Sequence, residues 1–329
     1  MQSEATANDL KPSAGIDVSI VIVSWNTRQL LWACLQSIFD QMRELVSEVF
    51  VIDNASRDGS AEMVLTEFPA VQLMANAKNL GFAAANNQGI RRASGRYILL
   101  LNPDTIILDA AIAHCVRYAD AHPDIGVLGC QVLEDIGADR IQRTGFSFPD
   151  PWNLFLIQAR LTKLFPRSRL FAKPELGWWD RNSDRDLDVI SGMFMLVRKE
   201  ALEQVGLMDE AYFVYGEEAD WCYRFRQAGW RRFFTTCARI VHFDGGSKST
   251  EQIKISMYVQ LQKSILIYHR KNLGFAAWLV AKAILVVSNA VRAAVWRASS
   301  VISRDPLVRN KSAAAMAALR FHLFGTDPR

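Results

Sequence analysis

The chain of 329 residues is predicted to fold as an α/β protein, with a mostly parallel sheet covered by helices on both faces. Two observations support this prediction. Short apolar runs alternate with helix-like stretches over the first hundred residues. The run Tyr97–Leu101 then ends abruptly in Asn102-Pro103-Asp104. Such a run is typical of a buried strand that delivers polar side chains to the carboxyl edge of a sheet, where open α/β folds bind ligands.

The individual elements follow from local patterns. The valines and isoleucines of Val18–Ser24 predict a buried strand, and residues 83–93 form an alanine-rich helix. Further strands are expected at 49–52, 71–74, 97–101, 127–133, 189–197 (interrupted at Ser191-Gly192) and 231–241. Further helices are expected at 28–39, 60–68, 199–204, 218–228 and over most of 253–304. The aromatic and basic stretch 146–179 predicts an insertion over the sheet edge, with one amphipathic helix at 152–164.

Composition excludes several classes of protein. Half of the residues are hydrophobic, which allows a sizeable core and excludes global disorder. The five cysteines are scattered without a CxxC pair, so neither a zinc site nor a disulfide framework is indicated, and a reduced, cytosolic setting is expected. Residues 1–15 are polar and lack a secretory pattern, which predicts a disordered tail.

The C-terminal region differs in charge from the rest. Residues 263–329 carry eleven Lys or Arg and two acids, a balance of +9 in a chain of net charge +4, which leaves −5 for the first 262 residues. The basic residues are interleaved with apolar runs, which favours an anionic membrane surface over nucleic acid as the partner. Between Asn272 and Val291 the only charge is Lys282. Three arrangements are compatible with this pattern: a helix in the membrane interface, a spanning helix, or a helix packed on the domain or on a second subunit.

A helical projection of this region separates two faces. The polar face is expected to hold Lys282, Asn289, Arg292, Arg297, Ser300 and Arg304. The apolar face is expected to hold Val280, Ile284, Val287, Val291, Val295 and Ile302, with Trp278 and Trp296 at the headgroup level.

Polar residues at element ends suggest a phosphorylated ligand. Asp53 ends a strand, where its carboxylate suits a ribose or base edge, although it also suits a turn cap. Asn79-Leu80-Gly81 opens a helix whose N–H groups favour a diphosphate, unless the small residues serve close packing alone. Ser24-Trp25-Asn26-Thr27 replaces the glycine-rich turn of dinucleotide-binding folds.

Three further groups carry candidate chemistry. Asp104 is placed to bind a divalent cation, and the alternative is a turn carboxylate. His242 ends an apolar run, and the alternative is a core or loop histidine. Glu217-Glu218-Ala219-Asp220 crowds three acids beside Trp221, which predicts a general base of raised pKa. The alternative is an acidic first turn favoured by the helix dipole.

Taken together, these motifs resemble family 2 glycosyltransferases of the GT-A fold, in the rhamnosyltransferase-like branch. The resemblance is carried by residues 18–26, 51–56, 79–87, 100–104, 191–198, 206–210 and 213–224 and by His242. Two positions depart from the family pattern. Asn102 stands where the metal motif has its first acid, and Glu218 stands where the base is usually an aspartate.

The resemblance implies an inverting sugar transfer with Mg²⁺ or Mn²⁺ as cofactor. It places Ser24, Asn26, Asp53, Asn79, Asn87, Asn102 and Asp104 near the nucleotide-sugar. It makes Asp104 and His242 metal ligands and places Glu218, Glu217 and Asp220 among the catalytic residues, with Glu218 as the base or, alternatively, Glu217. It makes Gly192, Trp178 and Trp179 acceptor-side residues.

The expected enzyme moves a sugar from a dTDP- or UDP-sugar, with L-rhamnose as the best guess, to a lipid-linked or glycan acceptor of the cell envelope. Its catalytic domain is expected at 16–262, with a nucleotide-binding half near 16–105 and an acceptor half near 106–262. Residues 263–329 would attach it to the cytoplasmic face of the inner membrane as a peripheral or monotopic protein, and a homo-oligomer is possible. The alternatives are a catalytically silent nucleotide-sugar- or glycan-binding assembly protein and a metal-dependent nucleotidyltransferase.

Overall fold

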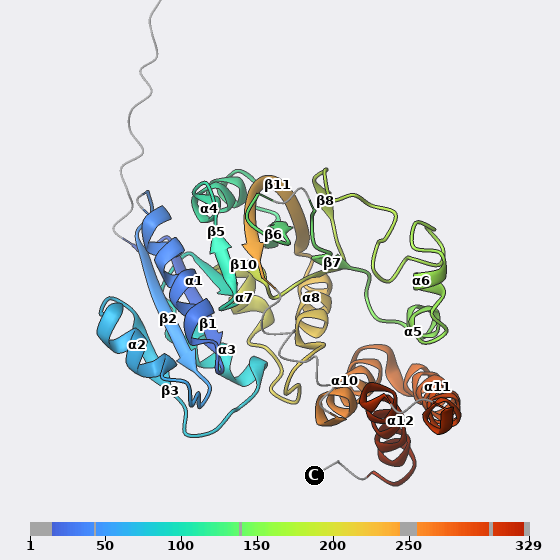
Figure 1. Ribbon diagram of the computed structural model, residues 1–329. Coiled ribbons are helices and arrows are strands. Elements are labelled where there is room, and N and C mark those ends of the chain that lie inside the picture. The colour runs from blue at the N-terminus through green and yellow to red at the C-terminus, as the bar shows by residue number, and fades with distance from the viewer. Residues whose placement is uncertain (1–14, 43, 138–139, 244–254, 303–304, 326–329) are drawn as a thin grey trace, which may run out of the picture.

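The computed structural model describes residues 15–42, 44–137, 140–243, 255–302 and 305–325, so the tail expected at 1–15 lies almost wholly outside the described residues. A central sheet carries helices on both faces, and the C-terminal helices form a separate bundle beside it (Figure 1). The predicted α/β class is confirmed.

The first half of the sheet is parallel, as the alternating pattern predicts. Its strands lie in the order β3-β2-β1-β4. The elements here are β1 (Val18–Ser24), α1 (Arg28–Gln41), β2 (Ser47–Asp53), α2 (Ser60–Glu67), β3 (Gln72–Ala75), α3 (Phe82–Ile90) and β4 (Tyr97–Leu101). β1 and β2 are parallel, and Ser24, the last residue of β1, is in register with Asp53, the last residue of β2. These two polar residues therefore meet at one edge of the sheet.

The second half of the sheet is mixed. β10 is antiparallel to both of its neighbours, β4 and β6, because the chain reaches it through the long excursion that follows β6. The elements are β5 (Thr105–Ile107), α4 (Ala111–Ala121), β6 (Ile125–Leu133), β7 (Gly145–Phe146), α5 (Pro151–Gln158), α6 (Leu161–Leu164), β8 (Arg185–Asp186), β9 (Val189–Ile190), β10 (Phe194–Arg198), α7 (Lys199–Val205), α8 (Glu217–Gln227) and β11 (Arg231–His242).

Three local differences from the predicted elements have physical causes. The single helix expected at 152–164 is divided into α5 and α6, because Arg160 adopts a left-handed φ of 59°. The strand expected at 189–197 is divided into β9 and β10 around Ser191-Gly192, as its interruption indicated. Helix α4 lacked a clear sequence pattern and was not predicted.

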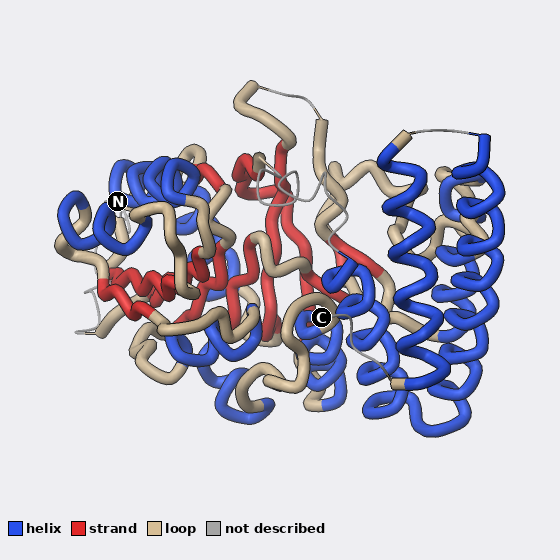
Figure 2. The backbone as a smooth tube through the Cα atoms, turned by 60° about the horizontal axis from the view of Figure 1, so that its bottom comes forward, coloured by secondary structure: helices blue, strands red, loops and turns tan. Residues whose placement is uncertain are grey.

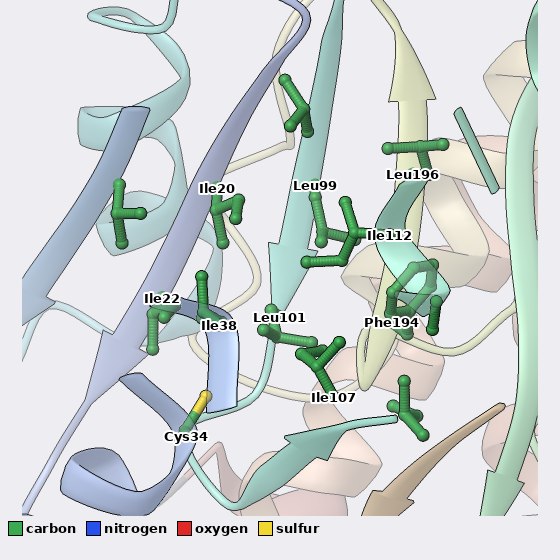
Figure 3. Packing of buried hydrophobic residues seen from close by; sticks show 14 of the residues in the cluster. Ile20, Ile22, Cys34, Ile38, Leu99, Leu101, Ile107, Ile112, Phe194 and Leu196 are labelled. Atoms are coloured by element: carbon green, nitrogen blue, oxygen red, sulfur yellow. The ribbon is translucent and has the colours of Figure 1, made fainter. Parts of the chain in front are cut away.

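The core lies on both faces of the sheet. On one face Ile20 and Ile22 of β1 pack with Leu99 and Leu101 of β4, under α1 and α4 (Figure 3). On the other face Val21 packs with residues of α3 and α8. This alternation follows from the two-residue period of a strand and explains why β1 and β4 carry apolar residues on both faces.

The C-terminal bundle consists of α10 (Ile255–Tyr268), the π-helical segment η1 (His269–Leu273), α11 (Gly274–Ile302) and α12 (Pro306–Phe324). Its long helices run side by side (Figure 2). The bundle is joined to the sheet domain by α10 and η1, since the Ser264 hydroxyl donates to the Val214 carbonyl at 3.1 Å. The boundary expected at residue 262 lies inside α10.

Both predicted faces of α11 exist, but the polar face is turned inward at Asn289 and Arg292, whereas Arg297 is exposed. Asn289 is fully buried and exchanges hydrogen bonds with Gln262 and Tyr258 of α10. Arg292 donates to the Tyr258 hydroxyl at 3.0 Å and to the Gln158 carbonyl of α5 at 3.3 Å. Four predicted apolar-face residues are about half exposed: Val280, Val287, Val291 and Val295. Arg304 and the side chain of Ile302 lie outside the described residues.

Candidate active site

The antiparallel pairing of β5 with β11 brings two distant motifs together. His242 is in register with Thr105, and the Phe243 amide donates to the Asp104 carbonyl at 3.0 Å. His242 Nε2 consequently lies 3.2 Å from Asp104 Oδ1, with both side chains more than nine-tenths buried. Asn102 completes the group, with Nδ2 at 3.3 Å from the same ring nitrogen. Asn102, Asp104 and His242 are called the Asp104–His242 corner below.

The loop before β10 connects this corner to the acidic helix. The backbone amide of Asn102 donates to the Met193 carbonyl at 3.2 Å. The adjacent Gly192 amide donates to Glu218 Oε1 at 3.3 Å. A Cβ at position 192 would lie 2.9 Å from that oxygen, so the glycine permits the close approach. Residues 192 and 193 thus place Glu218 and the Asp104–His242 corner on either side of one short loop.

Helix α8 presents its acids in the first turn, as the helix-dipole alternative anticipated. It begins after Gly216, whose φ of 93° turns the chain sharply into the helix. Glu218 is half-buried, and the loss of hydration raises the pKa of its carboxyl. Glu217 is almost fully buried, and burial followed by the charge of Glu218 raises the pKa of its carboxyl well above the usual value.

Asp220 does not join these acids in the open site, contrary to its placement among the catalytic residues. It is fully buried and accepts from Arg224 at 3.0 Å, and from Lys271 and Asn272 of η1 at 2.9 Å each. Its carboxylate therefore joins α8 to the C-terminal bundle. The cause is the helical period, which turns Asp220 away from Glu218 and toward the bundle.

The edge formed by β1 and β2 holds the predicted nucleotide residues. Asp53 is buried, and its Oδ2 accepts from the Ser56 amide at 3.0 Å while Oδ1 has no hydrogen-bond partner within the described structure. Ser24 exchanges a hydrogen bond with Thr27 at 2.9 Å. Asn26 accepts from the Arg57 amide at 2.8 Å and shapes the turn after β2. A buried acceptor without a partner is costly, so Asp53 Oδ1 is suited to a ligand donor.

The two predicted asparagines of the α3 region lie differently. Asn79 accepts from the Gly81 amide and from Asn54 Nδ2, both at 2.9 Å, which orders the turn into α3. Asn54 was not singled out from the sequence, although it follows Asp53 directly. Asn87 donates to the Met208 carbonyl and to Glu210, each at 2.9 Å, and accepts from the Met208 amide. It therefore ties α3 to the segment after α7 and contacts none of the other predicted site residues.

The two tryptophans expected on the acceptor side have separate environments. Trp179 is buried in the core, edge-on to Phe234 at 4.9 Å. It packs in the core, and its acceptor-side role stays a prediction. Trp178 is half-buried, with the guanidinium groups of Arg169 and Arg185 over its ring at 5.0 and 4.8 Å.

The donor set fits a hard divalent cation that shares its ligands with a phosphate. Asp104 offers a carboxylate and His242 an imidazole nitrogen, and such ions commonly use one or two protein carboxylates beside substrate phosphates. Among the described residues no group of three or more His, Cys, Asp or Glu is placed to hold a metal alone. Oxygens of a bound diphosphate and of water would complete the coordination.

Comparison with known proteins identifies the family. The model of glycosyl transferase family 2 matches residues 19–206, more than half of the chain. The chain belongs to glycosyl transferase family 2. The predicted family is therefore confirmed. The matched segment includes every predicted site residue except those of α8 and His242.

Two relatives extend the comparison. The chain is 27% identical over 220 residues to N-acetylglucosaminyl-diphospho-decaprenol L-rhamnosyltransferase of Mycobacterium tuberculosis, which covers 59% of this chain and 66% of that protein. It is 26% identical over 248 residues to O-antigen biosynthesis protein RfbC of Myxococcus xanthus, which covers 73% of this chain and 18% of that protein. The match thus spans slightly under two thirds of the mycobacterial relatives and a fifth or less of the Myxococcus protein.

A solved structure shows the same fold over nearly the whole chain. The mannosyltransferase from Pyrobaculum calidifontis, in complex with GDP-Man and Mn²⁺, has a TM-score of 0.52 at 18% identity. The similarity covers 98% of this chain and 91% of that one. The predicted GT-A fold is confirmed.

Proposed function

We propose that this chain is an inverting glycosyltransferase that transfers a sugar from a nucleotide-sugar to an acceptor hydroxyl. The observation that supports it most is the loop of Gly192 and Met193, which touches Glu218 on one side and Asn102 on the other. A single displacement at the anomeric carbon requires a base for the acceptor hydroxyl on one side of the sugar and a group that holds the leaving diphosphate on the other. Glu218 and the Asp104–His242 corner, on either side of this loop, are the proposed groups. Family membership and the GT-A fold support the same reaction class.

The chain's own residues would divide the work as follows. Glu218 takes the proton of the acceptor hydroxyl while that oxygen forms a bond to the anomeric carbon. The bond from this carbon to the diphosphate breaks on the opposite face, so the configuration inverts. The buried Asp53 carboxylate holds the nucleoside, and Asp104 with His242 holds the metal and the diphosphate. When bound, Mg²⁺ or Mn²⁺ supplies positive charge that stabilises the leaving diphosphate.

For the donor we propose a dTDP- or UDP-sugar, with dTDP-L-rhamnose first, and for the acceptor a lipid-linked glycan of cell-envelope polysaccharide biosynthesis. The similarity to a rhamnosyltransferase whose name includes a diphospho-decaprenol substrate supports this choice. The name of the Myxococcus relative supports a polysaccharide product. The catalytic unit is assigned to residues 16–262 and the membrane-associated region to 263–329.

We propose that the enzyme lies at the cytoplasmic face of the inner membrane, and the exposed apolar side of α11 supports the membrane association. Every exposed residue of α11 from Phe275 to Val295 is apolar, and this set is called the apolar stripe. Its largest members are Phe275, Leu279, Val280, Val287, Val291 and Val295, each 48–62% exposed. A helix that buries polar residues and exposes apolar ones lacks a suitable partner in water, whereas a bilayer supplies one.

The neighbouring helix α5 adds the charge and aromatic groups that a membrane surface attracts. α5 packs on α11 through Leu154, which contacts Ala281 and Leu285, and exposes Trp152 and Phe155. Residues 151–173 contain five exposed basic residues and no acid: Arg160, Lys163, Arg167, Arg169 and Lys173. Basic side chains near an anionic surface contribute about 1 kcal/mol each.

The contacts of α11 favour insertion parallel to the membrane plane. By length and composition, Ile255–Val301 is the one helical stretch among the described residues that passes as a membrane span. The middle of α11, however, is bonded to α5, with Ser288 donating to Gln158 at 3.2 Å. Leu156 of α5 is buried in the protein. A spanning α11 would carry α5 into the bilayer with it, and the part of the catalytic unit that packs around Leu156 would have to follow.

A nucleotide-release assay tests the proposed reaction. The full chain with Mn²⁺ or Mg²⁺ is offered dTDP-, UDP- and GDP-sugars together with a lipid-diphosphate-sugar acceptor. Acceptor- and metal-dependent release from one donor is expected. Tight nucleotide binding without release over a broad set of acceptors would instead indicate a silent binding protein. Cleavage and transfer at phosphorus would indicate a nucleotidyltransferase.

A further inference from the structure

Gln142 makes two hydrogen bonds to one residue, His242. Its Nε2 donates to the His242 carbonyl at 2.5 Å, and its Oε1 lies 3.0 Å from His242 Nδ1. The carbonyl accepts hydrogen bonds but cannot donate them, so the NH₂ group of Gln142 must face it. The amide oxygen therefore faces the ring, and His242 Nδ1 must carry the proton that this oxygen accepts.

In the neutral imidazole, the state of the second ring nitrogen follows from the first. A neutral imidazole with a proton on Nδ1 has its lone pair on Nε2. This lone pair points to the Asp104–His242 corner, where Asp104 Oδ1 lies 3.2 Å away. Asn102 Nδ2, at 3.3 Å, is placed to donate to the same nitrogen. Two acceptors that face each other in a buried corner are stabilised when a cation lies between them.

We infer that Gln142 is a positioning residue that fixes the tautomer and ring orientation of His242, so that Nε2 is presented as a ligand to the divalent cation. This inference rests on the proposed function, because it assigns His242 to the metal and diphosphate. Residues that hold the far nitrogen of a ligating histidine commonly tune metal affinity in this way. No sequence pattern singled out Gln142.

The backbone around Gln142 is suited to this role. The chain turns back after β6, and the Gln142 amide donates to the Val132 carbonyl at 2.7 Å. Ile141 is bridged to Leu133, and the neighbouring Val241 of β11 is also in register with Leu133. Gln142 and His242 are therefore fixed to the same end of β6 from two sides.

Titration of the full chain with Mn²⁺ in the presence of UDP or dTDP, followed by the electron paramagnetic resonance signal of free Mn²⁺, tests this role. Gln142→Met keeps the side-chain length and removes both hydrogen bonds, and about 10–100-fold weaker Mn²⁺ binding is expected. Gln142→Glu keeps an acceptor for the Nδ1 proton, so most of the affinity should be retained. Gln131→Met is the matched control, because Gln131 is a buried glutamine bonded to the Arg181 carbonyl.

A second readout reports the tautomer directly. Long-range ¹⁵N–¹H spectra of the full chain should show His242 protonated at Nδ1 in the wild type and Gln142→Glu, and a mixture of tautomers in Gln142→Met. Wild-type Mn²⁺ affinity and an unchanged tautomer in Gln142→Met would overturn the inference, as would a wild type that does not bind Mn²⁺. Weakened Mn²⁺ binding in Gln142→Met, in a protein that transfers no sugar, would support the inference and contradict the proposed reaction.

Discussion

The sheet domain and the C-terminal bundle distribute polarity in opposite ways. In the sheet domain β1 and β4 are buried and mostly apolar, and acidic side chains follow the strands where they end, at Asp53 and Asp104. In the bundle α11 turns Asn289 and Arg292 toward α10 and α5, with Asn289 fully buried, and exposes the apolar stripe. The first arrangement buries apolar residues and gathers polar groups at the strand ends. The second leaves apolar side chains of α11 exposed.

Under the proposed function, catalysis depends on one region of the molecule and membrane attachment on the other. The groups proposed for catalysis lie on the sheet domain, and the residues proposed for the membrane lie on α5 and α11. The two regions are joined at Asp220, which accepts hydrogen bonds from Lys271 and Asn272 of η1. Substitutions in one region should therefore change the reaction without changing membrane binding, and the reverse should hold in the other region.

The largest expected effect is on the base. Glu218→Gln keeps the size of the side chain and removes its ability to take a proton, so the transfer rate should fall by about 10²–10⁴-fold. Glu217→Gln is the matched control, because Glu217 is the adjacent acid but is almost fully buried, and this variant should retain most of the activity. Transfer rates with saturating donor and acceptor measure both. The opposite order would make Glu217 the base.

The second-largest expected effect is on the stabilisation of the leaving diphosphate. Asp104→Asn removes the negative charge of the Asp104–His242 corner and should lower kcat by about 10²–10³-fold. The matched control is Asp109→Asn, since Asp109 lies a few residues along the chain with a highly exposed side chain. Vesicle binding should stay unchanged in both variants. Full activity of Asp104→Asn would remove the corner from the proposed mechanism.

A smaller effect is expected from the apolar stripe. The double variant Val287→Glu/Val291→Glu places two charges on the exposed side of α11, which should abolish flotation with vesicles that contain anionic lipid. Activity on a short water-soluble acceptor should persist. Leu65→Glu is the control, because Leu65 is 65% exposed on the distant helix α2. Loss of a dimer with no change in vesicle binding would show that a second copy covers the stripe.

The smallest effect is on stability against pH. The pKa of Glu217 is raised in the folded state, so the folded chain keeps this proton at pH values where the unfolded chain has lost it. Stability should therefore fall as pH rises from the usual glutamate range toward the raised pKa. Glu217→Gln should remove this part of the slope in urea unfolding at several pH values. If the free energy of unfolding falls equally with rising pH in the wild type and in Glu217→Gln, burial does not raise the pKa of Glu217.

The sequence predicted the elements of the expected nucleotide-binding half well and those of the expected acceptor half less well. Strands such as Val18–Ser24 and Tyr97–Leu101 are defined by local runs of apolar residues, so their positions were predicted to within about two residues. The burial of Asp220 and Trp179 was not predicted, because their neighbours come from distant segments. The ion pairs with Lys271 and the packing against Phe234 have no local pattern.

Gln142 and the inward polar face of α11 were missed for a related reason. A glutamine in a loop carries no periodic pattern, and its role arises only when β11 places His242 beside it. A helical projection separates polar from apolar positions, but it does not tell which face the rest of the chain covers. That depends on α5, α10 and α12, which contact α11 in the folded chain.

The anomeric configuration of the product tests the central claim most directly. With the donor that supports nucleotide release, the product linkage can be compared with that of the donor sugar by nuclear magnetic resonance. One displacement assisted by Glu218, with the diphosphate held at the Asp104–His242 corner, predicts an inverted configuration. A retained configuration would contradict this mechanism, because it requires two displacements or a reaction on the same face of the sugar.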